Sequence, residues 1–245
     1  MLRITLISNS KMREISSCEV CGNKKLIPFL DLGKQPLCDD LIPIGDESIV
    51  KRYPIQVGLC KHCNTAHQKF QIEPEYLFPD SYHYRARFTK DVIHGMQDLV
   101  CSVEGLYGSL EGKKVLDIGC NDGSLLKIFY NHGASTVGIE PTKAIDDAGS
   151  EVQVKIKEYF NISSAKKLKD NYGPFDIITF TNVFAHIKNL KLLINALKII
   201  ISDHTVLIIE NHYLASVIKT GQFDTFYHEH PRTYSVKSFV HISDL

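Results

Sequence analysis

The chain has 245 residues, 44% of them hydrophobic, and its 28 lysine and arginine residues balance its 28 aspartate and glutamate residues. This length and composition suit a globular protein with a substantial core, and the balanced charge gives no basic face that would favour nucleic acid as a partner. No apolar run approaches the roughly 18 residues of a membrane-spanning helix, and the apolar residues before Met12 lack a cleavage-site pattern, so we expect a cytoplasmic protein with no membrane association.

After Met12, which offers an alternative start, the first pattern is a pair of C-x-x-C motifs separated by 38 residues. In a cytoplasmic protein, seven cysteines indicate metal binding or burial rather than disulfides. Each motif lies in a turn, where two thiolates can point at one ion, and two such motifs complete a tetrahedral four-sulfur site. We therefore predict a closed, structural zinc site, with a redox dithiol as the alternative. The four predicted ligands are Cys18, Cys21, Cys60 and Cys63.

The spacing between the two motifs exceeds that of common zinc ribbons, so the intervening segment should form its own hairpin from residues 30–37 and 53–59. We expect the nearby His62 and His67 on the surface or in packing rather than as ligands. Of the remaining cysteines, we expect Cys38 and Cys101 to be buried thiols. We expect Cys120 to be a small side chain that fills space in a glycine loop.

The composition along the chain predicts three parts. The zinc-binding module occupies residues 13–75, and a linker with two prolines follows it. Residues 76–110 hold a stretch rich in aromatic and cationic residues and then a helix at 89–108, where apolar residues recur at helical spacing. The third part is residues 111–245.

In the third part, predicted strands and helices alternate. This alternation with short connections predicts an α/β, doubly wound parallel sheet, in which a ligand lies across the carboxyl ends of the strands. The predicted strands are 115–118, 136–140, 152–156, 175–180 and 206–210, and the predicted helices are 124–131, 163–171 and 190–201.

The loop after the first strand identifies the cofactor class. Residues 117–123 read D-I-G-C-N-D-G, and seventeen positions after Gly123 a second strand ends in Glu140. A carboxylate there is placed to accept hydrogen bonds from ribose hydroxyls, close to the roughly 20-residue offset of nucleotide-binding folds. A dinucleotide loop has glycine in the middle position, where this chain has Asn121. Asparagine tolerates the left-handed conformation, so the turn survives.

Asp122 then distinguishes among adenosine cofactors, because a carboxylate repels a pyrophosphate but attracts a sulfonium and an amino-acid ammonium group. The loop therefore predicts an S-adenosylmethionine site, and an ordinary strand–turn–helix corner and a dehydrogenase are the disfavoured alternatives. No G-K-[ST] motif indicates a P-loop. The predicted cofactor-binding residues are Asp117, Gly119, Asn121, Asp122, Gly123, Glu140, Pro141 and, after the fourth strand, Asn182.

Titratable residues follow the fourth and fifth strands. His186 opens the connection after Asn182, and residues 226–230 read F-Y-H-E-H. Histidine is the usual general base, a neighbouring glutamate can orient it, and tyrosine can donate a hydrogen bond to an oxyanion. A catalytic cluster is therefore predicted; a surface loop with incidental histidines and a second metal site are the alternatives.

Taken together, these motifs resemble those of the zinc-containing, S-adenosylmethionine-dependent sugar C-methyltransferases that act on nucleotide-linked keto-deoxysugars. The resemblance runs from about Cys18 to Phe239 and rests on the two C-x-x-C motifs and on residues 31–37, 117–123, 138–141, 182–186, 210–213 and 227–230. It implies a Rossmann-like class I methyltransferase sheet. It also implies that a base removes the proton alpha to a ketone, after which the enolate attacks the sulfonium methyl group.

The resemblance also implies roles for single residues. Matching active-site positions are Tyr82 and Tyr84 as an aromatic pair, His186, Tyr227, Glu229 and His230. We expect His230 to act as the base, with His186 as the next candidate, and Tyr227 to hold the developing oxyanion. The implied partner is a nucleotide-sugar with a 4-keto-deoxysugar, which would make this an enzyme of deoxysugar biosynthesis.

Two departures from the family pattern matter. Arg85-Ala86-Arg87 follows the tyrosine pair, where the family often has serines. The chain also stops before the closing strand pair of methyltransferase sheets and before the further domain of the family, which predicts a truncated methyltransferase domain. The alternatives are therefore an O-methyltransferase of the same fold, and a non-catalytic fragment that holds zinc and cofactor.

Overall fold

The computed structural model describes residues 12–39 and 41–245. Contacts group these residues into two compact units. The first unit combines the described part of Met1–Leu77 with Tyr213–Asp244, and the second unit is Phe78–His212, with Leu245 grouped beside it. Residues 1–11, the apolar residues before Met12 in which no cleavage-site pattern was found, lie outside the described residues.

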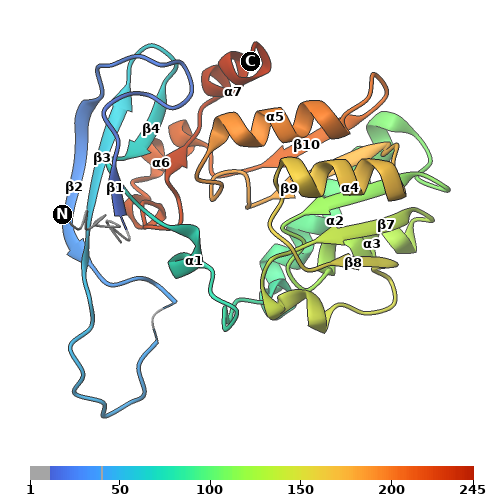
Figure 1. The fold of residues 1–245 in the computed structure, drawn as a ribbon, viewed down its shortest axis with the longest axis horizontal. Helices are drawn as coiled ribbons and strands as arrows, with labels where there is room; N and C mark the ends of the chain where they lie inside the picture. The colour runs from blue at the N-terminus through green and yellow to red at the C-terminus, as the bar shows by residue number, and fades with distance from the viewer. Residues whose placement is uncertain (1–11, 40) are drawn as a thin grey trace, which may run out of the picture. The chain divides into compact units, whose positions relative to one another are not determined.

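The second unit is built on a five-stranded parallel sheet with the order β10-β9-β6-β7-β8 (Figure 1). Strands β6 and β9 lie side by side although they are not consecutive. The connection after β6 leads to β7 on one side of this pair, and the connection after β9 leads to β10 on the other side. Such a switch point is where ligands bind in open α/β sheets. The strands are β6 (Lys114–Ile118), β7 (Ser135–Ile139), β8 (Val154–Ile156), β9 (Ile177–Thr181) and β10 (Val206–Glu210), which confirms the five predicted strands.

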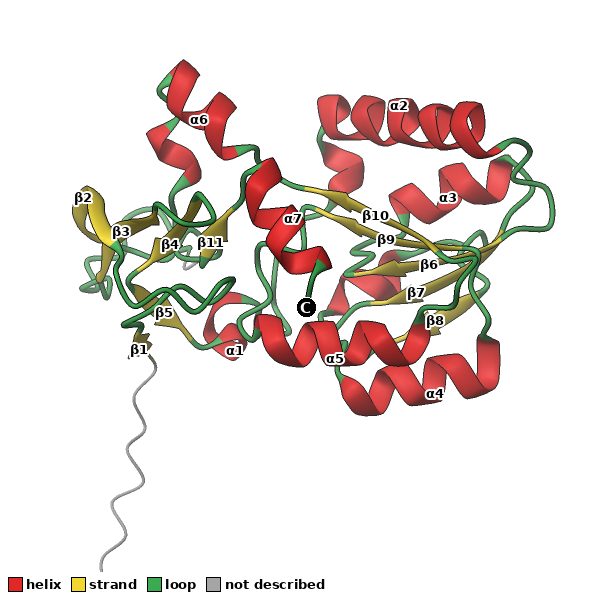
Figure 2. Cartoon of the chain, turned by 90° about the horizontal axis from the view of Figure 1, so that it is seen from above, coloured by secondary structure: helices red, strands yellow, loops and turns green. Residues whose placement is uncertain are grey.

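Helices cover both faces of this sheet (Figure 2). Residues Val115 to Ile118 of β6 are fully buried, as expected for a strand packed on both faces. Asn161 and Asn189 cap α4 and α5 through side-chain bonds to backbone N–H groups. The helices are α2 (Lys90–Tyr107), α3 (Ser124–Asn131), α4 (Ile162–Tyr172) and α5 (Leu190–Ile200), with short 3-10 turns at Ala86–Phe88 and Lys143–Asp147, and they confirm the predicted helices and the α/β fold.

The first unit contains a four-stranded antiparallel sheet with the order β11-β4-β3-β2 and a two-stranded sheet of β1 and β5. Leu30 lies opposite Val57 in the β2–β3 pair, which confirms the predicted hairpin between the C-x-x-C motifs. The strands are β1 (Met12–Glu14), β2 (Ile27–Gln35), β3 (Tyr53–Cys60), β4 (Thr65–Gln68), β5 (Phe70–Ile72) and β11 (Arg232–Thr233), and the helix α1 (Pro74–Leu77) follows β5.

The segment after β10 belongs to the first unit by its contacts. It forms α6 (Leu214–Thr220), a 3-10 turn at Phe223–Thr225, β11 and α7 (Val236–Ser243). Leu214, Val217 and Phe226 form one apolar cluster with Val57 and Ala66 of the sheet. The domain boundaries at 13–75, 76–110 and 111–245 stay predictions, and this grouping of contacts differs from them because apolar burial joins α6 to β3 and β4.

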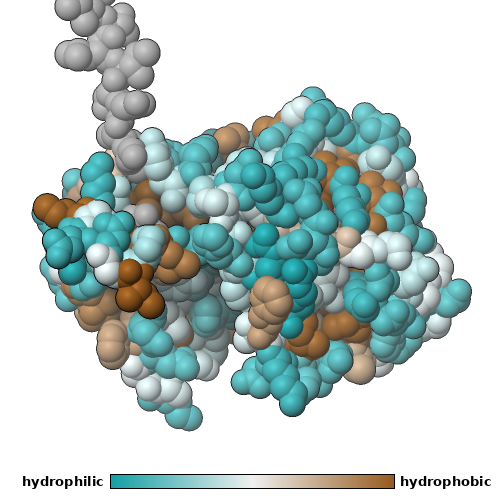
Figure 3. Space-filling model, turned by 90° about the horizontal axis from the view of Figure 1, so that it is seen from below, coloured by the Kyte–Doolittle hydropathy of each residue, from teal (hydrophilic) through white to brown (hydrophobic). Residues whose placement is uncertain are grey.

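The surface mixes polar and apolar side chains. Figure 3 shows one face on which hydrophilic residues predominate and hydrophobic residues gather in separate groups. Ile44 and Ile49, in the loop between β2 and β3, are fully exposed. Within the described residues, no helix has the length and hydropathy needed to cross a membrane.

Candidate functional site

The four cysteines of the C-x-x-C motifs converge in the first unit. Their Sγ atoms lie within 4.8 Å of one another, with 3.4 Å between Cys18 and Cys63 and 3.6 Å between Cys21 and Cys60. Four thiolates about 2.3 Å from a tetrahedral zinc ion would be roughly 3.8 Å apart, so the donor set fits zinc. With four protein ligands no position is open, and the predicted structural zinc site is confirmed at the level of its ligand cluster.

The predicted non-ligand histidines lie outside this cluster. His62 is exposed, and His67 is buried on β4 with its Nε2 atom 3.2 Å from Cys18 Sγ. Burial lowers the pKa of His67, which favours the neutral ring. His67 therefore supports a ligand rather than replacing one, an outer-shell role common at metal sites.

The remaining cysteines divide into one buried and two exposed residues. Cys120 is buried in the glycine loop, as predicted. The prediction of buried thiols at Cys38 and Cys101 is wrong, because both residues are exposed. Helix α2 buries Met96, Val100 and Val103, which places position 101 outside its apolar stripe.

The glycine loop of the second unit has the conformation that its sequence predicts. Gly119, Asn121 and Gly123 have φ values of +75°, +51° and +76°, so Asn121 does occupy the left-handed region. A Cβ on Gly119 would lie 2.5 Å from Val183 Cγ2, so only glycine fits where the loops after β6 and β9 pack together. The Gly119 N–H donates to Ile139 O at 2.8 Å, which fixes the loop to β7.

Glu140 follows β7 directly and is only 7% exposed. Its Oε2 accepts a hydrogen bond from the Asn121 N–H at 3.2 Å, and its Oε1 accepts from the Thr142 N–H and hydroxyl at 3.0 and 2.7 Å. A carboxylate has about four acceptor sites, so it keeps capacity for a further donor. These contacts fix the carboxylate at the carboxyl end of the sheet, and its contact with a ribose stays a prediction. Pro141 follows it, half-buried.

Asp117 lies in the interior of the sheet beneath the loop. The Thr179 hydroxyl donates to its Oδ1 at 2.6 Å, and burial raises the pKa of its carboxyl to about 7. Asp117 thus links β6 to β9 at the switch point. Its contact with the cofactor stays a prediction.

Asp122 has a different environment from the one predicted. Its side chain has no exposed surface; Oδ1 accepts from the Ser124 N–H and hydroxyl, and Oδ2 accepts from the Arg87 N–H at 3.1 Å. Both oxygens therefore hold the start of α3 and the preceding segment, rather than presenting an open carboxylate to an ammonium group.

The segment containing the Arg85-Ala86-Arg87 departure binds the glycine loop. The Ala86 N–H donates to Asn121 Oδ1, and Asn121 Nδ2 donates to Tyr84 O, both at 3.1 Å. Arg85 pairs with Asp147 at 2.6 Å, and this hydrogen bond lowers the pKa of Asp147. Ala86 and Tyr84 thus attach this segment to the glycine loop, and Arg85 attaches it to Asp147.

Aromatic rings in the second unit bring three predicted residues together. Phe78 stacks on His186 with ring centroids 5.2 Å apart, and it meets Tyr82 edge-on at 5.4 Å. The rings of Tyr82 and Tyr84 are 6.5 Å apart. Sequence reasoning missed Phe78, which lies in the proline-containing linker and gives no signal of its own beyond the aromatic density that follows it.

Asn211, the second residue of the 210–213 motif, also lies at this edge of the sheet. Its Oδ1 accepts from the Ala185 N–H at 3.2 Å, so the amide orientation is set and Nδ2 points elsewhere. Asn211 Nδ2 and Thr181 Oγ1 are buried atoms with no hydrogen-bond partner among the described residues. Asn182 is exposed with φ +57°, and its N–H donates to Glu210 O at 3.0 Å.

The Tyr227, Glu229 and His230 cluster belongs to the first unit. His228, Glu229 and His230 are all buried, so the surface-loop alternative is wrong. His230 Nδ1 lies 2.9 Å from Thr225 O, and its ring centroid is 4.3 Å from that of Tyr227. Glu229 Oε1 accepts from the Cys38 thiol at 2.7 Å. In the described part of the chain, only the four zinc cysteines form a possible metal cluster, which leaves the second-metal alternative without support.

The predicted catalytic residues are therefore divided between the units. Tyr82, Tyr84 and His186 lie in the second unit, and Tyr227, Glu229 and His230 lie in the first.

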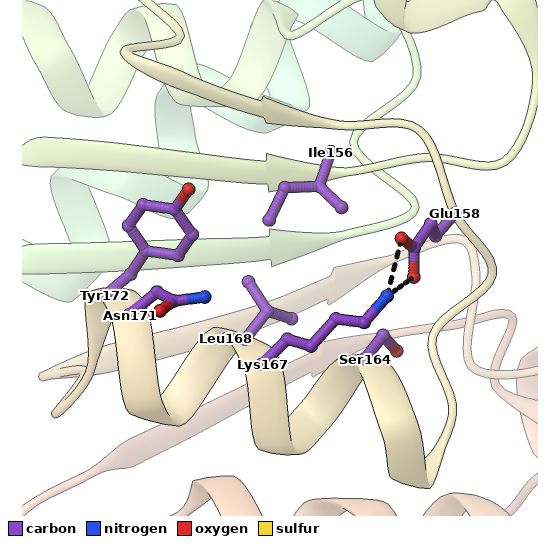
Figure 4. A pocket seen from close by; sticks show the side chains of 7 residues that line it. All are labelled: Ile156, Glu158, Ser164, Lys167, Leu168, Asn171 and Tyr172. Atoms are coloured by element: carbon purple, nitrogen blue, oxygen red, sulfur yellow. Dashed lines mark hydrogen bonds and ion pairs between the residues drawn. The ribbon is translucent and has the colours of Figure 1, made fainter.

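A hollow of about 180 Å³ between β8 and α4 lies apart from these residues (Figure 4). Lys167 and Glu158 form an ion pair at its rim, with Nζ 2.9 Å from Oε1. None of the predicted cofactor or catalytic residues lines it. Its lining is Ile156, Glu158, Ser164, Lys167, Leu168, Asn171 and Tyr172.

Comparison with known proteins gives matches to both parts of the chain. A family model described as a methyltransferase domain matches residues 88–244, and one described as a putative zinc binding domain matches residues 18–78. The C-methyltransferase NovU of Streptomyces niveus is 27% identical over 231 residues, which cover 93% of this chain and 54% of that protein. A ubiquinone biosynthesis O-methyltransferase of Acinetobacter baylyi is 31% identical over 93 residues, 36% of this chain and 39% of that protein.

This chain thus spans about half, or less, of the length of these curated relatives. Among solved structures, a SAM dependent methyltransferase from Archaeoglobus fulgidus has a TM-score of 0.47 at 20% identity, covering 60% of this chain and 67% of that one. A putative O-methyltransferase from Nostoc punctiforme has a TM-score of 0.48 at 16% identity, covering 62% and 49%.

Proposed function

We propose that this chain, which belongs to the S-adenosylmethionine-dependent methyltransferases and carries a four-cysteine zinc-binding module, methylates a carbon atom of a nucleotide-linked 4-keto-deoxysugar. One observation carries the choice of carbon over oxygen. The C-methyltransferase NovU aligns with 93% of this chain, including the zinc-binding module, whereas the O-methyltransferase of Acinetobacter baylyi aligns with 36% of it. The sugar comes from the motif resemblance alone.

The cofactor, when bound, supplies an electrophilic methyl group on a sulfonium. Glu140 would hold its ribose hydroxyls, because this carboxylate is fixed by Asn121 and Thr142 at the end of β7 and retains acceptor capacity. The backbone turn of Gly119, Asn121 and Gly123 would lie against the rest of the bound S-adenosylmethionine.

Removal of a carbon-bound proton requires a base. The bond between His230 Nδ1 and the Thr225 carbonyl requires the hydrogen to be on Nδ1, so in the neutral ring Nε2 carries the lone pair. His230 is 4% exposed and packs against Tyr227. In our proposal Nε2 takes the alpha proton of the ketone, and Tyr227 donates a hydrogen bond to the enolate oxygen that develops.

Two further candidate residues belong to the second unit. Asn211 has a buried Nδ2 donor, and its other end holds the Ala185 N–H beside His186. A neutral donor of this kind can bind a carbonyl or hydroxyl oxygen of a ligand held by the second unit. His186, stacked on Phe78, is the second candidate base.

The test uses S-adenosylmethionine, or its demethylated product, with a thymidine diphosphate 4-keto-deoxysugar in deuterated water. Deuterium at the alpha carbon, followed by a new carbon–methyl group, supports the proposal. Methylation of oxygen without exchange would indicate the O-methyltransferase alternative, and cofactor binding without either reaction would indicate the non-catalytic alternative; both contradict the proposal. His230→Asn should abolish exchange and spare cofactor affinity, whereas His204→Asn, at an exposed histidine, should change neither.

A further inference from the structure

Glu19 is a charged residue in an unusual place, between the zinc cysteines Cys18 and Cys21. Its side chain is only 16% exposed, and its carboxylate is surrounded by donors. Oε2 accepts from Arg232 Nη1 at 2.6 Å and from Gln71 Nε2 at 2.8 Å, and Oε1 pairs with Arg13. A zinc turn that only closed a metal site would not need this carboxylate.

The main partner of Glu19 comes from the carboxyl-terminal part of the same unit. Arg232 lies two residues after His230, and its side chain has no exposed surface. Its Nε donates to the Tyr234 hydroxyl at 2.8 Å, and β11 places Arg232 opposite His67 on β4. A buried guanidinium is strongly unfavourable without a counter-ion, so the Glu19 carboxylate stabilises this arginine here.

Gln68 provides a second attachment between the same segments. Its backbone N–H donates to Pro231 O at 2.9 Å, and its side-chain Nε2 donates to Tyr227 O at 3.3 Å. One residue therefore holds both ends of the turn that contains Glu229 and His230. Its neighbour His67 contacts Cys18 Sγ at 3.2 Å, so adjacent residues of β4 contact the metal cluster and the turn.

We propose that the zinc-binding module positions the catalytic base: Glu19 and Gln68 hold the Tyr227–Arg232 turn, so loss of their contacts lowers proton abstraction and leaves cofactor binding unchanged. This inference rests on the proposed role of His230. Cys18 and Cys21, when bound to zinc, would fix the turn that carries Glu19. Glu19 pairs with Arg232, and the β11–β4 pairing holds Arg232 two residues after His230. The predicted cofactor residues, from Asp117 to Asn182, all belong to the other unit. Glu19, Gln68 and Arg232 are positioning residues.

The experiment compares Glu19→Gln with a matched control, Glu14→Gln. Glu14 is a glutamate of the same module that is 57% exposed and pairs with Lys69 at the surface. Glu19→Gln keeps the size of the side chain and removes its charge. Four quantities are measured on the full chain: zinc content, S-adenosylmethionine affinity, the pH profile of alpha-proton exchange, and the histidine ring ¹⁵N spectrum, with His230 assigned from His230→Asn.

We expect Glu19→Gln to retain zinc and cofactor affinity, to lower exchange about tenfold or more, and to alter the His230 ring signal, with Glu14→Gln unchanged in all four. Exchange and ring signal equal to wild type in zinc-loaded Glu19→Gln would overturn the inference, as would a parallel loss of cofactor affinity. Gln68→Met, which removes one uncharged donor, should lower exchange in the same direction if Glu19→Gln does not fold. A wild-type protein without exchange would refute the proposed function, and the ring signal would still test the positioning.

Discussion

Replacement of Glu140 with glutamine is the sharpest test of the cofactor site, because the carboxylate is held from both sides. Its oxygens accept from the Asn121 N–H on one side and from Thr142 on the other. A glutamine has only one acceptor oxygen, so its NH₂ group must face one of these donors. The substitution therefore removes the negative charge and also places two donors against each other.

The size of the effect follows from the hydrogen bonds to the ribose. A hydrogen bond to a charged group contributes about 1.5–3 kcal/mol net. Loss of one such bond to a ribose hydroxyl should weaken S-adenosylmethionine binding by roughly 10- to 150-fold, since about 1.4 kcal/mol corresponds to a factor of ten. Glu158→Gln, at an exposed glutamate after β8, serves as the control and should leave the affinity unchanged.

Isothermal titration calorimetry of both variants measures this difference, with thermal unfolding recorded to confirm that each is folded. An affinity of Glu140→Gln within twofold of wild type would refute the assignment of Glu140 as the ribose anchor. Equal losses in both variants would show that the effect comes from general charge rather than from this carboxylate.

Three further changes test other parts of the structure. Burial raises the pKa of Asp117 from 3.8 to about 7, so the folded state holds this proton more tightly than the unfolded state does. The free energy of unfolding should therefore fall as the pH rises from about 4 to about 7. Urea unfolding of Asp117→Asn at several pH values should lack that part of the fall, and an unchanged slope would contradict the raised pKa. Asn211→Leu should lower methyl transfer about tenfold with cofactor affinity preserved, and equal loss of both would assign Asn211 to the cofactor. Removal of zinc by a chelator should increase proteolysis within the first unit, because binding of a structural ion stabilises the fold; an unchanged digestion pattern would contradict a structural role.

Much of the second unit could be predicted from local patterns. Alternation of apolar strands with amphipathic helices was sufficient to place β6 to β10, and asparagine at position 121 was sufficient to predict a left-handed turn. These features depend on residues close in sequence. The four-cysteine cluster could also be predicted, because two motifs of fixed spacing have a single simple chemical use.

The features that were missed depend on pairs of residues far apart in the chain. Asp122 looks like an open carboxylate in its own loop, but its Oδ2 is bound by the N–H of Arg87, 35 positions earlier. Cys38 gives no local signal that its thiol reaches Glu229, 191 positions later. Helix α6 has an apolar stripe, and no pattern in it identifies β3 and β4 as its partners. Tertiary packing decides such contacts, and one sequence does not display them.

Removal of a proton from carbon by His230, before methyl transfer, is the step on which the proposed function depends. Its most direct measurement is the rate at which solvent deuterium enters the alpha carbon of a thymidine diphosphate 4-keto-deoxysugar, for wild type, His230→Asn and His204→Asn. We expect exchange with wild type and His204→Asn, and none above background with His230→Asn at unchanged cofactor affinity. Exchange that persists in His230→Asn, or methyl transfer by wild type without exchange, would contradict it.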